Sequence, residues 1–252
     1  MEEQKIFNPF SLSSKSILVT GASSGIGRAI AVACANMGAI VYITARNEAA
    51  LNETISLMYD EKGVVIPADL TKQDDINRLI DALPQLDGVV HCAGVGSRVL
   101  CKNIGVEDIE HIFKPNTEGP ILLQATLLAH KKIKKSASIV FIASRAANAP
   151  SIGNAIYSAS KGAILAYAKC LALELAPRQI RVNCICPAMV WTDLIIQDGL
   201  TKEELEEAQL KYPLKRYGKP EDVAYLALFL LSDAASWMTG SDIDLTGGAK
   251  EL

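Results

Sequence analysis

The chain has 252 residues, of which 50% are hydrophobic and 21% charged, so it can bury the core of a soluble α/β domain. A formal net charge of -3 argues against general binding to nucleic acid or to a membrane surface. No charged-then-apolar leader opens the sequence and no apolar run reaches membrane-spanning length, which predicts a cytoplasmic protein.

Residues 1–14 form a polar N-terminal arm, and a buried strand and a glycine-rich turn follow it. Residues 16–20 are apolar without alternation, as in a strand that is buried on both faces. Gly21, Gly25 and Gly27 come next and lead into a helical pattern. Such a turn lets backbone pass close to a pyrophosphate and directs helix N-terminal amides at it. The spacing Gly-x-x-x-Gly-x-Gly departs from the usual dinucleotide fingerprint, so this turn alone is weak evidence.

The end of the next predicted strand, residues 39–44, favours NADP(H). An NAD-binding unit is expected to place a carboxylate here for the ribose 2′-hydroxyl, whereas an arginine accommodates a 2′-phosphate. Ala45 and Arg46 supply one cation and no carboxylate. The alternative is that Arg46 is an ordinary solvated loop residue.

Strands and helices alternate along the rest of the chain. The predicted elements are helix 28–37, helix 48–60, strand 64–70, helix 72–83, strand 88–94, helix 107–129, strand 138–144, helix 157–175, strand 181–186, helix 220–232 and strand 243–246. This alternation predicts one α/β domain, a Rossmann-like doubly wound parallel sheet with helices on both faces. Gly21, Arg46, Asp69 and Gly94 all fall at carboxyl ends of strands, where such sheets bind their ligands.

Two features of the central region are set apart by composition. Asn116 stands between Pro115 and Gly119 inside a helical pattern, which indicates a kink that frees backbone groups for a water or side-chain contact. The alternative is that Asn116 only satisfies that kink. The basic segment 131–135 is expected to be a solvated loop. The six cysteines include no Cys-x-x-Cys pair, and they favour reduced apolar packing over a disulfide or a metal site.

Tyr157 and Lys161 are the strongest candidates for chemistry. Their spacing of four residues puts both side chains on one face of a helix, where the ammonium would favour the phenolate form of the tyrosine. Ser144, at the end of a predicted strand, can bring a hydroxyl to the same place. An isolated pair of this kind is most often only a helix surface, so the surrounding motifs decide the interpretation.

Taken together and in order, these motifs resemble the short-chain dehydrogenase/reductase family, in the branch that includes 3-oxoacyl-acyl-carrier-protein reductases. The resemblance extends from about residue 10 to residue 248. It is carried by residues 20–27, Asp69 with Leu70, Ala93 with Gly94, Asn116, Ser144, residues 157–161, residues 181–183, Pro187 with Thr192, and residues 212–221.

The resemblance implies a catalytic tetrad and a cofactor site. Tyr157 would be the acid/base, Ser144 would polarise the carbonyl, Lys161 would favour the phenolate and hold the ribose, and Asn116 would anchor a proton-relay water. The implied NADP(H) contacts are Gly21, Ser23, Ser24, Gly25, Ile26, Gly27, Arg46, Asp69, Leu70, Ala93, Gly94, Tyr157, Lys161, Pro187, Val190 and Thr192. No metal is expected.

Two positions depart from the pattern of the family. The usual Asn-Asn-Ala-Gly has His91 and Cys92 in place of its asparagines, which removes an amide that ties neighbouring strands together. The usual Pro-Gly after the sixth strand has Ala188 as its second residue, and this methyl group is expected near the nicotinamide.

The expected function is NADPH-dependent reduction of a ketone, with a 3-oxoacyl-acyl-carrier-protein as the first choice of substrate. A reductase of a sugar, a steroid-like or another small ketone is the alternative, since the segment 191–212 expected over the substrate mixes apolar and acidic residues. A nucleotide-sensing regulator with the same fold is the non-enzyme alternative. Such a regulator would be expected to lose Tyr157 or Lys161, and both are present.

The resemblance also implies partners. A homotetramer or homodimer is expected through the helices around Asn116 and Tyr157. An acidic acyl carrier protein would need a basic patch beside the active-site mouth. The candidates are Lys131, Lys132, Lys134, Lys135 and Arg178. The alternative role of the four lysines is to keep the protein soluble.

Overall fold

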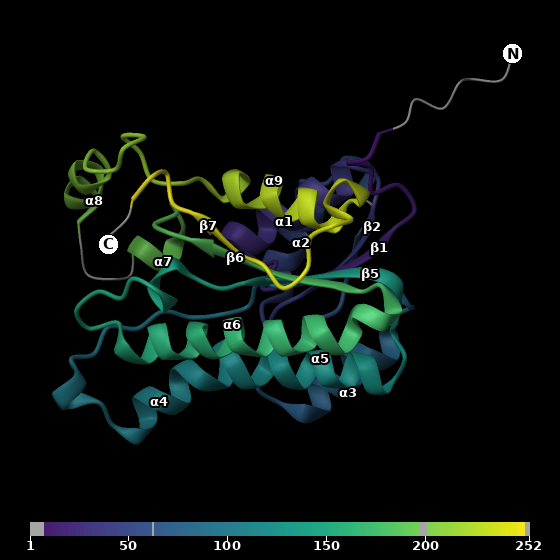
Figure 1. The fold of residues 1–252 in the computed structure, drawn as a ribbon, viewed down its shortest axis with the longest axis horizontal. Coiled ribbons are helices and arrows are strands. Elements are labelled where there is room, and N and C mark those ends of the chain that lie inside the picture. The colour runs from purple at the N-terminus through teal and green to yellow at the C-terminus, as the bar shows by residue number, and fades with distance from the viewer. Residues whose placement is uncertain (1–7, 62, 197–200, 250–252) are drawn as a thin grey trace, which may run out of the picture.

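The computed structural model describes residues 8–61, 63–196 and 201–249, and it contains one seven-stranded parallel sheet between layers of helices (Figure 1). The strands are β1 (Ser16–Thr20), β2 (Ile40–Thr44), β3 (Gly63–Val65), β4 (Leu86–His91), β5 (Ile133–Ile142), β6 (Arg181–Pro187) and β7 (Asp242–Leu245). The helices are α1 (Gly25–Asn36), α2 (Glu48–Ser56), α3 (Gln73–Ala82), α4 (Val106–Phe113), α5 (Gly119–Ala129), α6 (Ala155–Leu175), α7 (Asp193–Ile196), α8 (Lys202–Gln209) and α9 (Pro220–Leu231).

The strand order is β3-β2-β1-β4-β5-β6-β7, which confirms the predicted doubly wound sheet. The chain runs outward from β1 to β3 and then returns to place β4 on the other side of β1. The order therefore reverses between β1 and β4. Ligands of open α/β sheets bind at such a switch point, beyond the carboxyl ends of the strands.

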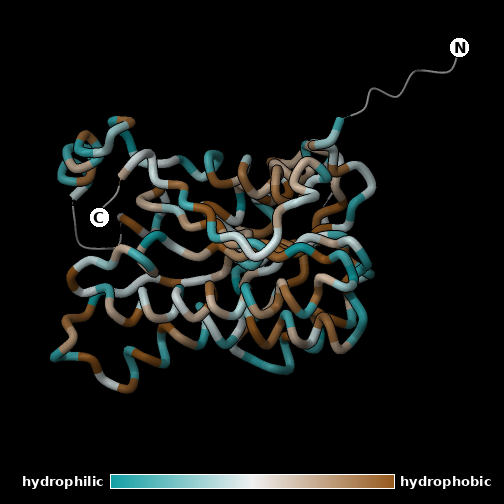
Figure 2. The backbone as a smooth tube through the Cα atoms, viewed as in Figure 1, coloured by the Kyte–Doolittle hydropathy of each residue, from teal (hydrophilic) through white to brown (hydrophobic). Residues whose placement is uncertain are grey.

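Both faces of the sheet are buried, which explains why its strands are apolar without alternation. On β1, Leu18 belongs to the core under α3, α5 and α6, while its neighbours Ile17 and Val19 belong to the core under α1 and α9. All three side chains are fully buried. Hydrophobic positions gather along the strands in the middle of the molecule (Figure 2). The period of two thus sends alternate side chains into two cores rather than one core and solvent.

Several predicted boundaries are wrong, each for a physical reason. The helix predicted over 28–37 begins at Gly25, because the glycine turn itself enters the helix. The strand predicted over 64–70 is only β3, since Pro67 has no N–H with which to continue the ladder. The N–H of Ala68 still bonds the end of β2 at 3.1 Å, so Asp69 is brought to the same edge of the sheet.

The basic segment 131–135 is not simply a solvated loop, because β5 begins at Ile133. Lys134 and Lys135 therefore lie in a strand, and the Lys134 ammonium is 2.8 Å from the Asp87 carboxylate on β4. The register between β4 and β5 shifts here, which marks an irregular strand start. Charged residues at an irregular strand end do not produce the apolar pattern from which the strand was predicted.

The predicted kink at Asn116 is confirmed. Residues Lys114–Glu118 form a π-helical turn between α4 and α5. Pro115 and Pro120 flank Asn116 and cannot donate an N–H to a regular helical ladder.

The first seven residues of the predicted N-terminal arm lie outside the described residues. Leu12, farther along the arm, is fully buried, and its N–H donates to the Met37 carbonyl at 3.1 Å. Within the described ranges, no helix combines the length and the apolar character needed to cross a membrane. In the same part of the chain, no group of three His, Cys, Asp or Glu side chains is arranged to hold a metal ion.

Candidate active site

The glycine-rich turn after β1 comes so close to the turn after β4 that side chains are excluded. Gly21 has φ +66°, and a Cβ atom on it would lie 2.8 Å from the backbone of Ala93. A Cβ atom on Gly27 would overlap the carbonyl oxygen of Gly21. Both glycines therefore form a cradle of bare backbone at the switch point, the shape that a pyrophosphate requires.

Side chains behind the turn fix its shape. The Arg28 guanidinium donates to the Ser23 carbonyl at 2.6 Å, and the Thr54 hydroxyl donates to the Ala22 carbonyl at 2.8 Å. Ser24 is the N-cap residue of α1, and within the described residues its side chain makes no capping hydrogen bond. The first amides of α1 are therefore open to an anion, so these residues fit a dinucleotide phosphate.

Arg46 and Asp69 lie at the ends of β2 and β3, where an adenosine would be held. The Arg46 side chain is exposed. Burial opposes ionisation of Asp69, but the hydrogen bonds from Thr71 and the charges of Lys72 and Arg46 hold the pKa of its carboxyl below the usual value. Asp69 is therefore ionised at neutral pH, and Arg46 is near enough to act on it.

The turn after β4 is held from two sides. The Thr20 hydroxyl, at the end of β1, accepts from the N–H groups of Cys92 and Ala93 at 3.0 and 3.1 Å. On the other side, Val95 exchanges two hydrogen bonds with the Asn116 amide, at 2.8 and 2.9 Å. Asn116 is only 1% exposed and lies in the π-helical turn, where it connects this loop to the helices.

Asn116 and Lys161 meet above Gly94. A Cβ atom on Gly94 would lie 3.0 Å from Asn116 Oδ1 and 3.4 Å from Lys161 Nζ. Asn116 Nδ2 is also 3.2 Å from the hydroxyl of Ser160 on α6. The structure thus brings three predicted site residues together from the turn after β4, the π-helical turn and α6.

Lys161 is a buried cation beside Tyr157. Its ammonium lies 5.9 Å from the centre of the Tyr157 ring and donates to the carbonyl of Ile142 at 2.9 Å. The residue is 6% exposed, so its charge is weakly screened. Ile142 uses one of the three ammonium hydrogens, and among the described residues no other acceptor takes the remaining two, which can serve a ligand or a water.

Ser144 follows β5 and lies two residues beyond Ile142. Its hydroxyl oxygen accepts from the N–H of Ala146 at 3.1 Å, and among the described residues no acceptor takes the hydroxyl hydrogen, which can therefore donate. That bond fixes the rotamer of Ser144 at the end of the strand. The arrangement suits a hydrogen bond to a carbonyl oxygen.

The remaining predicted cofactor residues lie around the glycine-rich turn, in the segment after β3 and at and after the end of β6. Leu70 lies against α5, since a Cβ atom on Gly119 would be 2.9 Å from its carbonyl oxygen. Pro187 ends β6 and pairs with β7. Val190 bridges to Gly218, and the Thr192 methyl group would lie 3.1 Å from a Cβ atom on Gly25. The segment after β6 therefore folds back over the glycine-rich turn.

The two departures from the family pattern have local explanations. Ala188 packs against the apolar cluster of Tyr212 and Tyr217 below the segment after β6. His91 stacks on Phe141 with ring centroids 4.5 Å apart. Burial raises the pKa of the Cys92 thiol to about 12, with Lys161 opposing, so Cys92 is a neutral thiol.

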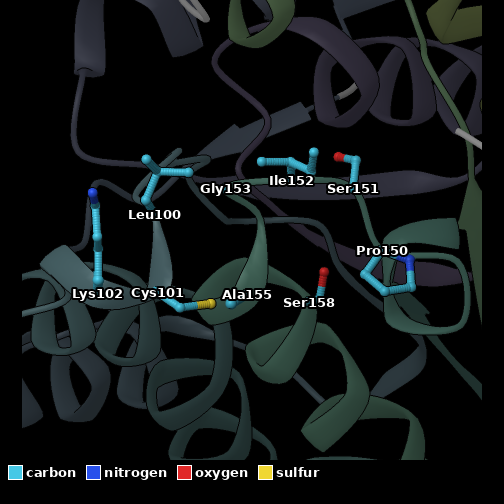
Figure 3. Close-up of a pocket in the computed structure, with 9 residues that line it drawn as sticks. All are labelled: Leu100, Cys101, Lys102, Pro150, Ser151, Ile152, Gly153, Ala155 and Ser158. Carbon is cyan, nitrogen blue, oxygen red and sulfur yellow. The ribbon is translucent and has the colours of Figure 1, made fainter.

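A cavity of about 610 Å³ opens beside the first turn of α6 (Figure 3). It is lined by Leu100, Cys101, Lys102, Pro150, Ser151, Ile152, Gly153, Ala155 and Ser158. Leu100 and Ile152 lie along one side, and the Ser158 hydroxyl points toward them from the other. Tyr157 is not among the lining residues, so the cavity flanks the tyrosine rather than covering it.

The basic candidates for carrier docking lie at the opposite end of the strands from the predicted site residues. Arg178 donates to the carbonyl of Ile133 at 2.6 Å, at the start of β5, whereas Ser144 follows its end. The rise from Ser138 to Ser144 alone is roughly 20 Å at the usual strand spacing. This corrects the expectation that the patch lies beside the active-site mouth of the same chain.

Thr20, Arg28 and Ser160 support the site but were not predicted from the sequence. Thr20 directly precedes the first glycine of the turn, and Ser160 directly precedes Lys161. Their places next to predicted site residues could have indicated both. No sequence signal pointed to Arg28, because its contacts with Thr54 and Ala50 depend on how α1 packs against α2.

Replacing Gly21 with alanine tests the cradle. The positive φ and the contact with Ala93 should lower the free energy of unfolding by roughly 1–3 kcal/mol and weaken NADPH binding. Gly162→Ala is the matched control, because a Cβ atom on that α6 glycine meets nothing within 4 Å. Urea denaturation and titration of NADPH fluorescence measure the two effects. Wild-type cofactor binding by Gly21→Ala would contradict the close approach.

The comparisons with known proteins agree with this geometry. The family model described as enoyl-(acyl carrier protein) reductase matches residues 21–250. L-xylulose reductase from Caenorhabditis elegans is 36% identical over 95% of this chain and 97% of its own length.

Two solved structures are similar over nearly their whole length. The 3-ketoacyl-(acyl-carrier-protein) reductase from Brucella melitensis, complexed with NADH, has a TM-score of 0.85 at 31% identity and covers 94% of this chain and 99% of that chain. A candidate NAD(P)-dependent gluconate 5-dehydrogenase from Beutenbergia cavernae, with NADP bound at low occupancy, has a TM-score of 0.86 at 31% identity and covers 96% of this chain and 98% of that chain. The chain therefore belongs to the short-chain dehydrogenase/reductase family of NAD(P)-dependent oxidoreductases.

Proposed function

We propose that the protein uses NADPH to reduce a ketone to a secondary alcohol, with a 3-oxoacyl thioester on acyl carrier protein as the substrate. The observation that carries the reaction type is the buried Lys161 ammonium, 5.9 Å from the Tyr157 ring and beside Asn116. The substrate class is supported by the likeness to the Brucella reductase.

The proposed cofactor contacts follow from the cradle. The backbone around Gly21 and the first amides of α1 would hold the pyrophosphate, and Arg46 would hold the adenosine 2′-phosphate. Lys161 would hold the nicotinamide ribose through the ammonium hydrogens that Ile142 leaves available. When bound there, the reduced nicotinamide supplies the hydride.

Side chains of this chain would transfer the proton to the ketone oxygen. The Tyr157 hydroxyl donates a proton to the ketone oxygen as charge develops on it, and the Ser144 hydroxyl donates a hydrogen bond to the same oxygen. The Lys161 ammonium stabilises the phenolate that remains. Asn116 would position a water that returns a proton towards Lys161.

A second candidate substrate is a keto sugar or another small ketone, which the 36% identity to L-xylulose reductase favours. The cavity beside α6 is the proposed place for the part of the substrate that does not react. Its Leu100 and Ile152 side chains are 47% and 84% exposed, so they offer an apolar surface, which suits an acyl chain better than a sugar.

The experiment that tests the proposal follows NADPH consumption with a panel of a carrier-bound 3-oxoacyl thioester, a free 3-oxoacyl thioester, a diketone and a keto sugar. The proposal predicts the highest kcat/KM for the thioesters. Preference for the keto sugar would replace the substrate by the second candidate. Equal use of free and carrier-bound thioesters would remove the carrier protein from the proposal.

The proposed homotetramer or homodimer determines which active site a docked acyl carrier protein could reach. The basic segment 131–135 lies far from Tyr157 of its own chain. A carrier protein docked on that segment would therefore deliver its substrate to Tyr157 of another copy. Light scattering at micromolar concentration measures the assembly, and a monomer would contradict this route.

Arg46→Asp is expected to reverse the cofactor preference. The wild type should prefer NADPH by about 10-fold or more in kcat/KM, and the carboxylate should repel the 2′-phosphate and accept the 2′-hydroxyl of NADH. Lys135→Asp makes the same charge change near the start of β5, at the opposite end of the strands, and serves as the control. Equal efficiency of the wild type with NADH and NADPH would contradict the role of Arg46.

A further inference from the structure

A buried histidine–glutamine pair connects the sheet to α5 behind the active site. His91 Nε2 lies 2.9 Å from Gln124 Oε1, and the two residues are 3% and 0% exposed. The imidazole also stacks on the Phe141 ring, with an interplanar angle of 10°. One side chain thus touches β5 through its face and α5 through its edge.

The pair is poorly satisfied as a purely structural contact. Among the described residues, neither His91 Nδ1 nor Gln124 Nε2 has a hydrogen-bond partner, although both atoms are buried. Burial lowers the pKa of His91 to about 4, with the Gln124 bond opposing, so the imidazole is neutral and carries one N–H. Buried polar atoms without partners cost free energy, and two apolar residues would pack here without that cost.

The position of the pair indicates what it does. His91 is the last residue of β4, and the turn that follows ends at Val95, which exchanges two hydrogen bonds with Asn116. Gln124 lies on α5, which follows the π-helical turn of Asn116 directly. The strand end and the helix are therefore joined at two points, with Gly94 between them.

The His91–Gln124 bond adds a tertiary contact next to the π-helical turn. In a regular α-helix each N–H bonds the carbonyl four residues back, but in the π-helical turn at Lys114–Glu118 the Gly119 N–H bonds the Lys114 carbonyl five residues back, so the register of the helical hydrogen bonds shifts here. The place of Asn116 relative to the sheet then depends on tertiary contacts. The His91 bond to Gln124 supplies one of them from the sheet side.

We propose that His91 and Gln124 are a positioning pair that holds Asn116 and the turn through Gly94 in register with Lys161, and so sets the rate of proton transfer. The inference rests on the proposed function, because it assigns Asn116 and Lys161 to the proton path. Neither member of the pair touches the reacting atoms. Both act through the turn and through α5.

The test uses two variants that separate stability from positioning. His91→Phe retains a ring that can stack on Phe141 but removes the hydrogen bond and leaves Gln124 unpaired. In His91→Phe/Gln124→Leu both partners are apolar, so much of the lost stability should return. Ser138→Ala is the control, because the Ser138 hydroxyl makes a buried 2.7 Å bond to the Leu230 carbonyl on the opposite face of the sheet.

Three readouts are compared: the melting temperature, kcat at saturating NADPH and ketone, and hydrogen exchange of the Val95 amide. We expect the double variant to recover melting temperature relative to His91→Phe, while its kcat stays about 10-fold or more below wild type. Its Val95 amide should exchange faster, because the bond to Asn116 is loosened. KM for NADPH should change much less than kcat, and Ser138→Ala should keep kcat.

Wild-type kcat in the double variant would overturn the proposal, because the pair would then serve stability alone. Unchanged protection of the Val95 amide would overturn it as well. If the wild type reduced no ketone in the panel, the proposed function would fail, but the Val95 exchange would still decide whether the pair holds the turn. The two failures are thus distinguishable.

Discussion

Tyr157→Phe is expected to lower kcat by at least roughly 10²-fold, the usual effect of losing a general acid. The variant keeps the ring beside Lys161 and removes only the hydroxyl that is proposed to donate the proton. NADPH binding should change little, since the proposed cofactor contacts of the ring are retained. Steady-state kinetics with the best ketone of the panel and a fluorescence titration of NADPH measure the two quantities.

Tyr225→Phe is the matched control, because that tyrosine is 64% exposed on α9 and lies outside the site. It should keep wild-type kcat. If Tyr157→Phe turned over at the rate of Tyr225→Phe, the proton donor would have to be another group.

Lys161→Ala is expected to impair both turnover and cofactor binding. In the proposed mechanism the buried ammonium would stabilise the Tyr157 phenolate and would bind the ribose, and alanine would supply neither function. We expect kcat to fall by about 10²-fold or more, together with a higher Kd for NADPH. Lys161→Met fills the same space without the charge, so it separates the loss of charge from the loss of packing.

The two substitutions at the site therefore have different signatures. Tyr157→Phe should separate kcat from NADPH affinity, whereas Lys161→Met should change both. Wild-type NADPH affinity in Lys161→Met would remove the ribose contact from the role of Lys161. Wild-type kcat in the same variant would remove its role in catalysis.

The parallel sheet could be predicted from local pattern because its cause is local. Residues 17–20 are buried on both faces, and the glycines that follow allow the positive φ angles of a tight turn. The kink at Asn116 was predictable for the same reason, since proline and glycine act on the backbone next to them. The sequence also predicted that Gly94 and Arg46 lie together at the carboxyl ends of the strands, because each follows a predicted strand or ends one.

The features that could not be predicted depend on contacts between residues that are far apart in the sequence. His91 meets Gln124 across 33 positions, and Thr20 accepts from Cys92 across 72. Nothing in the neighbourhood of either residue in the sequence specifies its partner. The start of β5 was missed because Lys134 is paired with Asp87, so a charged residue occupies a strand where local pattern indicates solvent.

The most direct test of the proposed reaction follows deuterium from NADPH into the product. NADPH labelled at its transferable position is incubated with the protein and the best ketone of the panel, and the alcohol is examined by mass spectrometry and NMR. The account predicts one deuterium on the carbinol carbon with wild type, and strongly reduced formation of that alcohol with Tyr157→Phe. NADPH oxidation without deuterium in the alcohol, or no alcohol from any ketone of the panel, would contradict it.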